Sequence, residues 1–158
     1  MADDERWQQT ARSHTVMFYK IAYSLLRSDT DAQDAVQQML LRTWEKRAGI
    51  RADSLRAYMT RALINECHNI NRQRKRIEYI SEYPPVAAPQ SNEYTEIYEA
   101  IDALPEKLKL PVYLRYLEGF SDVEAARSLG IPVTTLRGRL HRARVRLRAM
   151  LDREVTLG

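Results

Sequence analysis

The sequence contains a single cysteine, Cys67, and no cluster of cysteines and histidines with the spacing of a zinc site. One cysteine cannot form a disulfide within the chain, so a reducing cytoplasm is the expected location. Cys67 and His68 are adjacent, and on a helix they point about 100 degrees apart, which does not suit a nucleophile and its base. We therefore expect no metal, no cofactor and no enzymatic activity.

Long apolar segments are also missing. The first ten residues are acidic and polar, unlike a signal peptide, and no later run is long enough to cross a bilayer. The chain has only five glycines and six prolines, and it lacks alternating apolar and polar runs bounded by turn residues. Because leucine, alanine, arginine, glutamate and glutamine are common instead, the sequence predicts an all-α protein without direct membrane insertion.

Arginine is concentrated in one short segment. The whole chain carries 25 lysines and arginines against 21 aspartates and glutamates, a net charge of only +4. Residues 137–148 nevertheless contain six arginines and no acidic residue. A solvated helix surface usually mixes both signs of charge, so this cluster favours an anionic partner, DNA, over a plain exposed face.

Residues 117–151 have the pattern of a helix-turn-helix. Ser121 followed by Glu124 is a capping-box signature, which predicts a helix start at Ser121. Gly130 provides the backbone freedom to leave that helix, and Pro132 suits the first turn of the next one. The second helix has an inward apolar stripe formed by Leu136, Leu140, Ala143, Leu147 and Met150.

Three more helices are expected in the N-terminal half of the chain. They are predicted at residues 15–27, 31–46 and 53–76, with a polar loop at residues 46–53. The first is expected to have its cap at Ser13 or Thr15 and to bury Val16 and Phe18. The third is expected to begin at Asp53 or Ser54.

The third helix ends in a second basic cluster. The cluster consists of Arg72, Arg74, Lys75 and Arg76. Basic side chains at a helix C-terminus can simply pair with the helix dipole. Asn65, Asn69 and Asn71 weaken that explanation, because asparagine is a poor helix former whose amide can pair with base edges.

Prolines divide the chain. Pro84, Pro85 and Pro89 exclude a continuous helix and favour an extended connector. The sequence thus predicts two small helical domains, residues 1–76 and 93–158, joined by a flexible linker at residues 77–92.

The second domain is expected to open with two helices, at residues 93–103 and 105–117. Pro111 lies in the first turns of the latter helix, where it is either tolerated or bends it. The side chains expected to support the helix-turn-helix are Ile97, Ile101, Leu104, Leu108, Val112 and Leu117.

Two basic helical domains in this order resemble a bacterial RNA polymerase sigma factor of the extracytoplasmic function (ECF) group, in the sigma-70 family. Residues 31–46 resemble the family's region 2.2, residues 54–76 its regions 2.3 and 2.4, and residues 103–151 its region 4. The resemblance implies a dissociable polymerase subunit. Its implied partners are core RNA polymerase, through the β′ clamp helices and the β flap, promoter DNA, and an inhibitory anti-sigma factor.

The resemblance assigns polymerase docking to the second helix. The docking face would consist of Asp31, Asp34, Gln37, Gln38 and Arg42. The family usually has an acid at the position of Gln38 and an aromatic residue at that of Leu40, so this chain departs from the pattern there. Asp31 and Asp34 also have a simpler explanation, because acids complement the dipole at a helix start.

For the minus-10 element, the resemblance implies that the loop at residues 46–53 captures a base flipped out of the non-template strand. The third helix would then lie against the upstream duplex. The residues implied in this contact are Arg51, Asp53, Ser54, Tyr58, Asn65, Asn69, Arg72, Arg74, Lys75 and Arg76. Tyr58 occupies a position where the family often has tryptophan, but a place in the core is an equal alternative.

For the minus-35 element, the helix after Pro132 would enter the major groove with its N-terminal half. The residues nearest base edges would be Thr134, Thr135, Arg137 and Gly138. Those on phosphates would be Arg139, His141, Arg142 and Arg144. Arg137 can contact guanine O6 and N7 together, whereas Gly138 allows close backbone approach.

The main alternative is a helix-turn-helix transcriptional regulator that binds DNA but does not act as a polymerase subunit. It explains the second domain. It leaves the polar face and the basic cluster of the first domain without a role.

Overall fold

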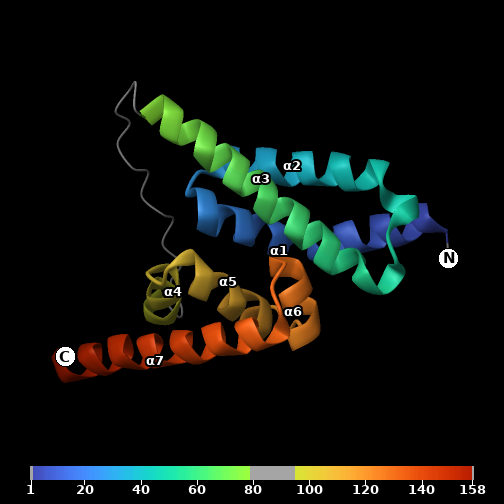
Figure 1. The fold of residues 1–158 in the computed structure, drawn as a ribbon. Coiled ribbons are helices and arrows are strands. Elements are labelled where there is room, and N and C mark those ends of the chain that lie inside the picture. The colour runs from blue at the N-terminus through green and yellow to red at the C-terminus, as the bar shows by residue number, and fades with distance from the viewer. Residues whose placement is uncertain (1, 79–94, 158) are drawn as a thin grey trace. The chain divides into compact units, whose positions relative to one another are not determined.

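The computed structural model describes residues 2–78 and 95–157, including the side chains of residues 2–75 and 96–152. The chain divides into two compact units, residues 1–87 and residues 88–158. All regular structure in the described part of the chain is helical (Figure 1). The expected all-α protein with two helical domains is therefore confirmed. Most of the expected linker, with its three prolines, lies outside the described residues.

Three helices form the first unit: α1 (Asp3–Leu26), α2 (Asp29–Glu45) and α3 (Leu55–Glu78). Each helix packs against the other two. Their shared core includes the fully buried side chains Phe18, Ile21, Met39, Met59 and Leu63. Burial of each such side chain contributes about 1.5–3 kcal/mol, and most of the stability of helices in proteins comes from such tertiary packing.

Helix α1 begins at Asp3, so the expected cap at Ser13 or Thr15 is wrong. The helix has no side-chain cap, but the acidic residues of its first turn complement the helix dipole. Val16 was expected in the core and is 67% exposed instead. A position two residues from the buried Phe18 points about 200 degrees away from it, so both side chains cannot face the same core.

Helix α2 begins at Asp29, so the expected start at residue 31 is two residues late. The hydroxyl of Ser28, at the N-cap, accepts a hydrogen bond of 3.2 Å from the backbone N–H of Asp31. The loop that follows α2 contains two short 3-10 turns, Arg47–Gly49 and Ala52–Ser54. The second turn occupies the positions where α3 was expected to begin.

Helix α3 begins at Leu55 and ends at Glu78. The predicted start at Asp53 or Ser54 is therefore one or two residues early. At the other end, the helix continues for two residues into the segment 77–92 that was expected to be linker.

The second unit contains α4 (Thr95–Asp102), α5 (Glu106–Val112), a π-helical turn η3 (Tyr113–Leu117), α6 (Asp122–Leu129) and α7 (Val133–Leu157). Its buried side chains include Ile101, Leu104, Leu108, Leu114, Phe120, Leu136 and Ala143. Ile97 was expected among them but is 47% exposed. It lies in the first turn of α4, ahead of the part of the helix that buries Ala100 and Ile101.

The continuous helix expected over residues 105–117 is interrupted. Pro111 has no N–H to donate to the carbonyl four residues earlier, and the α-helical bonding ends at Val112. In the π-helical turn that follows, the N–H of Glu118 donates to the carbonyl of Tyr113 at 3.0 Å. Gly119 has a φ of 71° and turns the chain toward α6, a conformation that favours glycine.

Candidate nucleic-acid and protein interfaces

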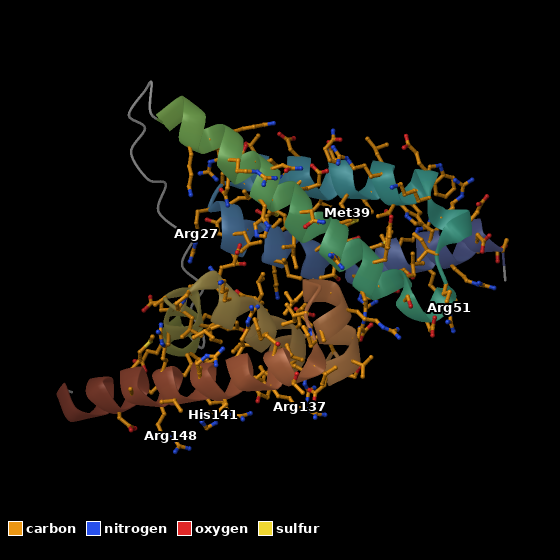
Figure 2. All side chains as sticks on the ribbon, viewed as in Figure 1. Arg27, Met39, Arg51, Arg137, His141 and Arg148 are labelled. Atoms are coloured by element: carbon orange, nitrogen blue, oxygen red, sulfur yellow. The ribbon has the colours of Figure 1, made fainter. Side chains whose placement is uncertain are left out.

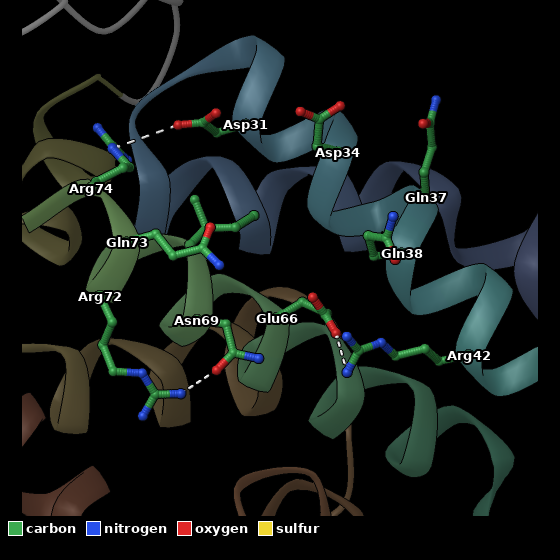
Figure 3. A pocket seen from close by; sticks show the side chains of 11 residues that line it. Asp31, Asp34, Gln37, Gln38, Arg42, Glu66, Asn69, Arg72, Gln73 and Arg74 are labelled. Carbon is green, nitrogen blue, oxygen red and sulfur yellow. Dashed lines mark hydrogen bonds and ion pairs between the residues drawn. The ribbon is translucent and has the colours of Figure 1, made fainter. Parts of the chain in front are cut away.

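A polar groove of about 820 Å³ lies between α2 and α3 in the first unit (Figure 3). All five residues of the predicted docking face line it: Asp31, Asp34, Gln37, Gln38 and Arg42. From α3 it is lined by Glu66, Asn69, Ile70, Arg72, Gln73 and Arg74. The structure therefore brings the predicted docking face and part of the predicted minus-10 surface together along one groove.

Arg42 reaches across this groove to Glu66. Its Nη1 lies 2.7 Å from Oε1 of Glu66, whose side chain is only 8% exposed. A nearly buried carboxylate requires a cationic partner, so Arg42 contributes to the packing of α2 against α3. The exposed members of the docking face that lie beside it are Asp34, Gln37 and Gln38.

Arg74 also has partners within the first unit. It forms an ion pair with Asp31 at 3.5 Å and donates a hydrogen bond to the carbonyl of Leu26, at the end of α1. Asn71 donates to the neighbouring carbonyl of Leu25 at 3.2 Å. These contacts satisfy carbonyls that the last turn of α1 leaves without helical partners, and they tie α3 to α1. Arg74 is thus less available to phosphates than its place in the basic cluster predicts.

The other predicted residues of α3 differ in their surroundings. Arg72 donates a hydrogen bond to the side chain of Asn69, and this pair lies along the groove. Asn65 and Lys75 are exposed. Arg76 belongs to α3, but its side chain lies outside the described residues.

The loop before α3 presents a small charged cluster. Nε of Arg51 lies 3.4 Å from Oδ1 of Asp53, and the hydroxyl of Ser54 donates to the same oxygen at 3.4 Å. The side chain of Arg51 is 84% exposed, so it can turn toward a ligand at little cost. Tyr58 is 37% exposed, which places its ring at the surface of the unit and not in the core. Stacking on a base therefore remains open to Tyr58.

In the second unit, α6 and α7 form the predicted helix-turn-helix. The hydroxyl of Ser121 accepts a hydrogen bond of 3.1 Å from the N–H of Glu124, which confirms the predicted cap. Gly130 ends α6 with a φ of 68°, the left-handed conformation expected of it. Ala125 and Ala126 are buried, and their small side chains allow α7 to approach α6 closely.

Helix α7 separates into a buried and an exposed face. Leu136, Leu140 and Ala143 are buried as predicted, whereas Leu147 and Met150 are only partly buried. Figure 2 shows Arg137, His141 and Arg148 projecting from the face that points away from α4 and α5. The exposed predicted residues are Thr134, Arg137, His141, Arg142 and Arg144, and the partly buried ones are Thr135, Gly138 and Arg139.

Two predicted DNA-binding arginines of α7 already contact other elements of the second unit. Nε of Arg137 donates a hydrogen bond of 3.1 Å to Oδ2 of Asp122, at the start of α6. This bond is the main reason that the pKa of Asp122 is lowered from 3.8, and the nearby Arg115 contributes as well. Arg144 donates a hydrogen bond to the hydroxyl of Tyr116. The sequence did not indicate either contact.

The part of the chain that the structure describes contains no group of histidine, cysteine, aspartate and glutamate side chains able to hold a metal ion. None of its helices is both long and apolar enough to span a membrane. Cys67 is buried in the core of the first unit.

Comparison with known proteins matches both units. The family model for Sigma-70 region 2 matches residues 10–77, and the model for Sigma-70, region 4 matches residues 94–147. The chain is 31% identical to the RNA polymerase sigma-E factor of Streptomyces avermitilis, over 92% of this chain and 85% of that protein. The chain belongs to the sigma-70 family, in its ECF group.

One further relative and one solved structure are similar to this chain over most of its length. The chain is 27% identical, over 92% of its length, to the ECF RNA polymerase sigma factor SigE of Mycolicibacterium smegmatis, and it spans 61% of that protein's length. A solved structure of the sigma factor RpoE from Bartonella quintana, in complex with the anti-sigma factor NepR, matches with a TM-score of 0.78 and 26% identity. That match covers 92% of this sigma-70 family member and 96% of RpoE.

The first turns of α1 lie before residue 10, where the match to sigma-70 region 2 begins. They contact Arg47 in the loop that follows α2. Nε of Arg47 lies 2.5 Å from Oδ1 of Asp4, its Nη1 donates to the carbonyl of Trp44 at 2.7 Å, and its guanidinium lies 3.6 Å from the centre of the Trp44 ring. This cluster was not predicted from the sequence, although the helical spacing of Trp7, Ala11 and Phe18 is a signal for it.

Proposed function

We propose that this sigma-70 family member binds core RNA polymerase and directs it to promoters through a minus-10 and a minus-35 element. The observation that carries the proposal is that both sigma regions occur in one chain, each with an exposed polar or basic face. A regulator that used only the helix-turn-helix would have no use for the groove of the first unit.

Core polymerase would dock on α2, against the β′ clamp helices. The exposed side chains Asp34, Gln37 and Gln38 are suited to this contact, because polar groups define register and charge complementarity more than affinity. Arg42 would act mainly by neutralising Glu66 and so by keeping the docking helix in place. The second unit would meet the β flap.

Promoter DNA would contact both units. In the first unit, Arg51, Tyr58 and Asn65 are exposed and would serve the minus-10 strand, where stacking of a flipped base on an aromatic ring contributes about 1–3 kcal/mol. In the second unit, Arg137 would read a base edge while Arg142 and Arg144 would bind phosphates.

The protein would act in the cytoplasm without catalysing a reaction, since the polymerase supplies the chemistry. An anti-sigma factor is a further proposed partner. The solved complex of RpoE with NepR supports this, because that sigma factor shares the fold of this chain over nearly its whole length.

Transcription with purified components tests the proposal. Core polymerase, mixed with this protein and a library of promoter fragments, should produce transcripts with defined starts that share two sequence elements upstream. Core polymerase alone is the control. If the protein bound DNA but neither bound core polymerase nor produced defined starts, it would be a regulator and the proposal would be wrong.

A further inference from the structure

We propose that Asp122 is a positioning residue that orients the guanidinium of Arg137 for base recognition. This inference rests on the proposed recognition of the minus-35 element by α7, and it adds a specificity-determining residue outside that helix. Asp122 itself would not contact a base.

The two oxygens of Asp122 serve different arginines. Oδ2 accepts the hydrogen bond of 3.1 Å from Nε of Arg137, and Oδ1 lies 2.6 Å from Nε of Arg115. Arg115 in turn donates through Nη1 to the carbonyl of Phe120 at 2.6 Å. Arg115 therefore holds the carboxylate from one side, and the carboxylate holds Arg137 from the other.

The side chain of Arg137 stays largely exposed although it is bonded to Asp122. Its side chain is 66% exposed, whereas that of Asp122 is 27% exposed. Because Nε is bonded to Asp122, the two terminal nitrogens of the planar fork remain for guanine O6 and N7. An arginine that is oriented before binding loses less rotamer freedom when DNA arrives.

Asp122 also stabilises the start of α6 through the helix dipole, and the experiment has to distinguish this role from the positioning of Arg137. An acid in the first turn of α6 complements the helix dipole, whatever lies opposite it. Glu124 lies in the same turn and adds to the same effect. The dipole does not require a bond to α7, so a test of base preference distinguishes the two roles.

The test uses full-length proteins, core polymerase and promoters with a randomised minus-35 element. Arg137→Ala should lower the preference for guanine at one position by about 5- to 150-fold. Asp122→Asn retains one oxygen, which cannot serve both arginines, and should lower the same preference by about 2- to 12-fold. In the Arg137→Ala background, Asp122→Asn should cause no further loss of preference.

Glu124→Gln is the matched control. It removes the same charge from the same turn, and glutamine can still complete a capping box. Both Asp122→Asn and Glu124→Gln should raise affinity for all sequences slightly, because each removes a negative charge near DNA. Only Asp122→Asn should change base preference. Asp122→Ser, which is too short to reach Arg137, should repeat the effect, and thermal unfolding of each variant shows whether it is folded.

An unchanged or sharper guanine preference in Asp122→Asn would overturn the inference, as would an equal loss in the presence and absence of Arg137. A failure of the proposed function looks different. In that case the wild-type protein itself would give no defined starts with core polymerase.

Discussion

The indole nitrogen of Trp7 donates a hydrogen bond of 3.0 Å to the hydroxyl of Thr43, 36 residues later in the chain. The ring of Trp7 also packs edge-on against that of Trp44, with centroids 4.9 Å apart. Through Trp44 and Arg47, these contacts connect the start of α1 with the loop proposed to meet the minus-10 element. The first turns of α1 thus stabilise the end of α2 and the start of that loop.

Trp7→Phe should lower the free energy of unfolding of the first unit by about 1 kcal/mol. The substitution removes the N–H donor and leaves an aromatic ring against Trp44. Both tryptophans of the chain lie in the first unit, so urea unfolding followed by the fluorescence of Trp44 reports on this unit. Tyr98→Phe, in the second unit, is the control. An unchanged midpoint in Trp7→Phe would show that the bond to Thr43 contributes nothing.

Neighbouring basic residues at the end of α3 should behave differently. Arg74→Ala should cost about 1 kcal/mol of stability, because it removes a donor to the Leu26 carbonyl and the partner of Asp31. Lys75→Ala should leave stability unchanged and reduce the slope of log affinity against log salt by about 1. Urea unfolding and DNA binding at several salt concentrations measure the two effects. If Arg74→Ala and Lys75→Ala changed stability and salt dependence equally, the assignment of Arg74 to packing and of Lys75 to DNA binding would be wrong.

Gly138→Ala should stabilise α7 and weaken DNA binding. A Cβ at this position would meet only Nη1 of Arg142, at the ordinary contact distance of 3.7 Å, and alanine favours a helix interior by about 1 kcal/mol over glycine. If α7 approaches DNA closely at Gly138, the added methyl group should lower minus-35 affinity. Thermal unfolding and binding to minus-35 duplexes test both effects. Gly49→Ala, where a Cβ would meet nothing within 4 Å, is the control, and unchanged DNA affinity in Gly138→Ala would exclude close approach.

The titration of Asp122 should depend on Arg137. The Arg137 hydrogen bond, with a smaller contribution from Arg115, lowers the pKa of Asp122 from 3.8. Because its pKa is lower in the folded protein, this carboxylate stabilises the fold at pH values above its pKa in the unfolded chain. That contribution is lost as the pH falls through its pKa in the folded protein. Carboxyl resonances followed by NMR should show the Asp122 midpoint moving upward in Arg137→Ala. Arg139→Ala should leave it in place, and equal shifts in both variants would indicate a general charge effect.

Much of the candidate site could be predicted because it depends on local pattern. The helix cap at Ser121 and the left-handed Gly130 involve contacts within a few residues, so the sequence itself contains both partners. The start of α1 was predicted too far along the sequence, because no capping side chain indicates a helix start at Asp3. Its first turns are held by Trp44 and Arg47, which are far away in the sequence.

The contacts of Arg74 could not be predicted from the sequence for the same reason, since its partners lie far away along the chain. Its sequence context, a run of basic residues at a helix end, is the same as that of Lys75. Only the packing of α3 beside the end of α1 places one of them near a carbonyl and a carboxylate and leaves the other exposed.

The sequence by itself determined the helical class, the helix-turn-helix and the arginine-rich face of α7, since these follow from residue spacing and from short-range caps. The tertiary structure alone decided which charged residues face outward and which are paired across elements. Asp122 with Arg137, and Arg42 with Glu66, are partners brought together by helix packing. An ion pair requires a distance of a few ångströms, and for residues 15 or 24 positions apart only the fold sets that distance.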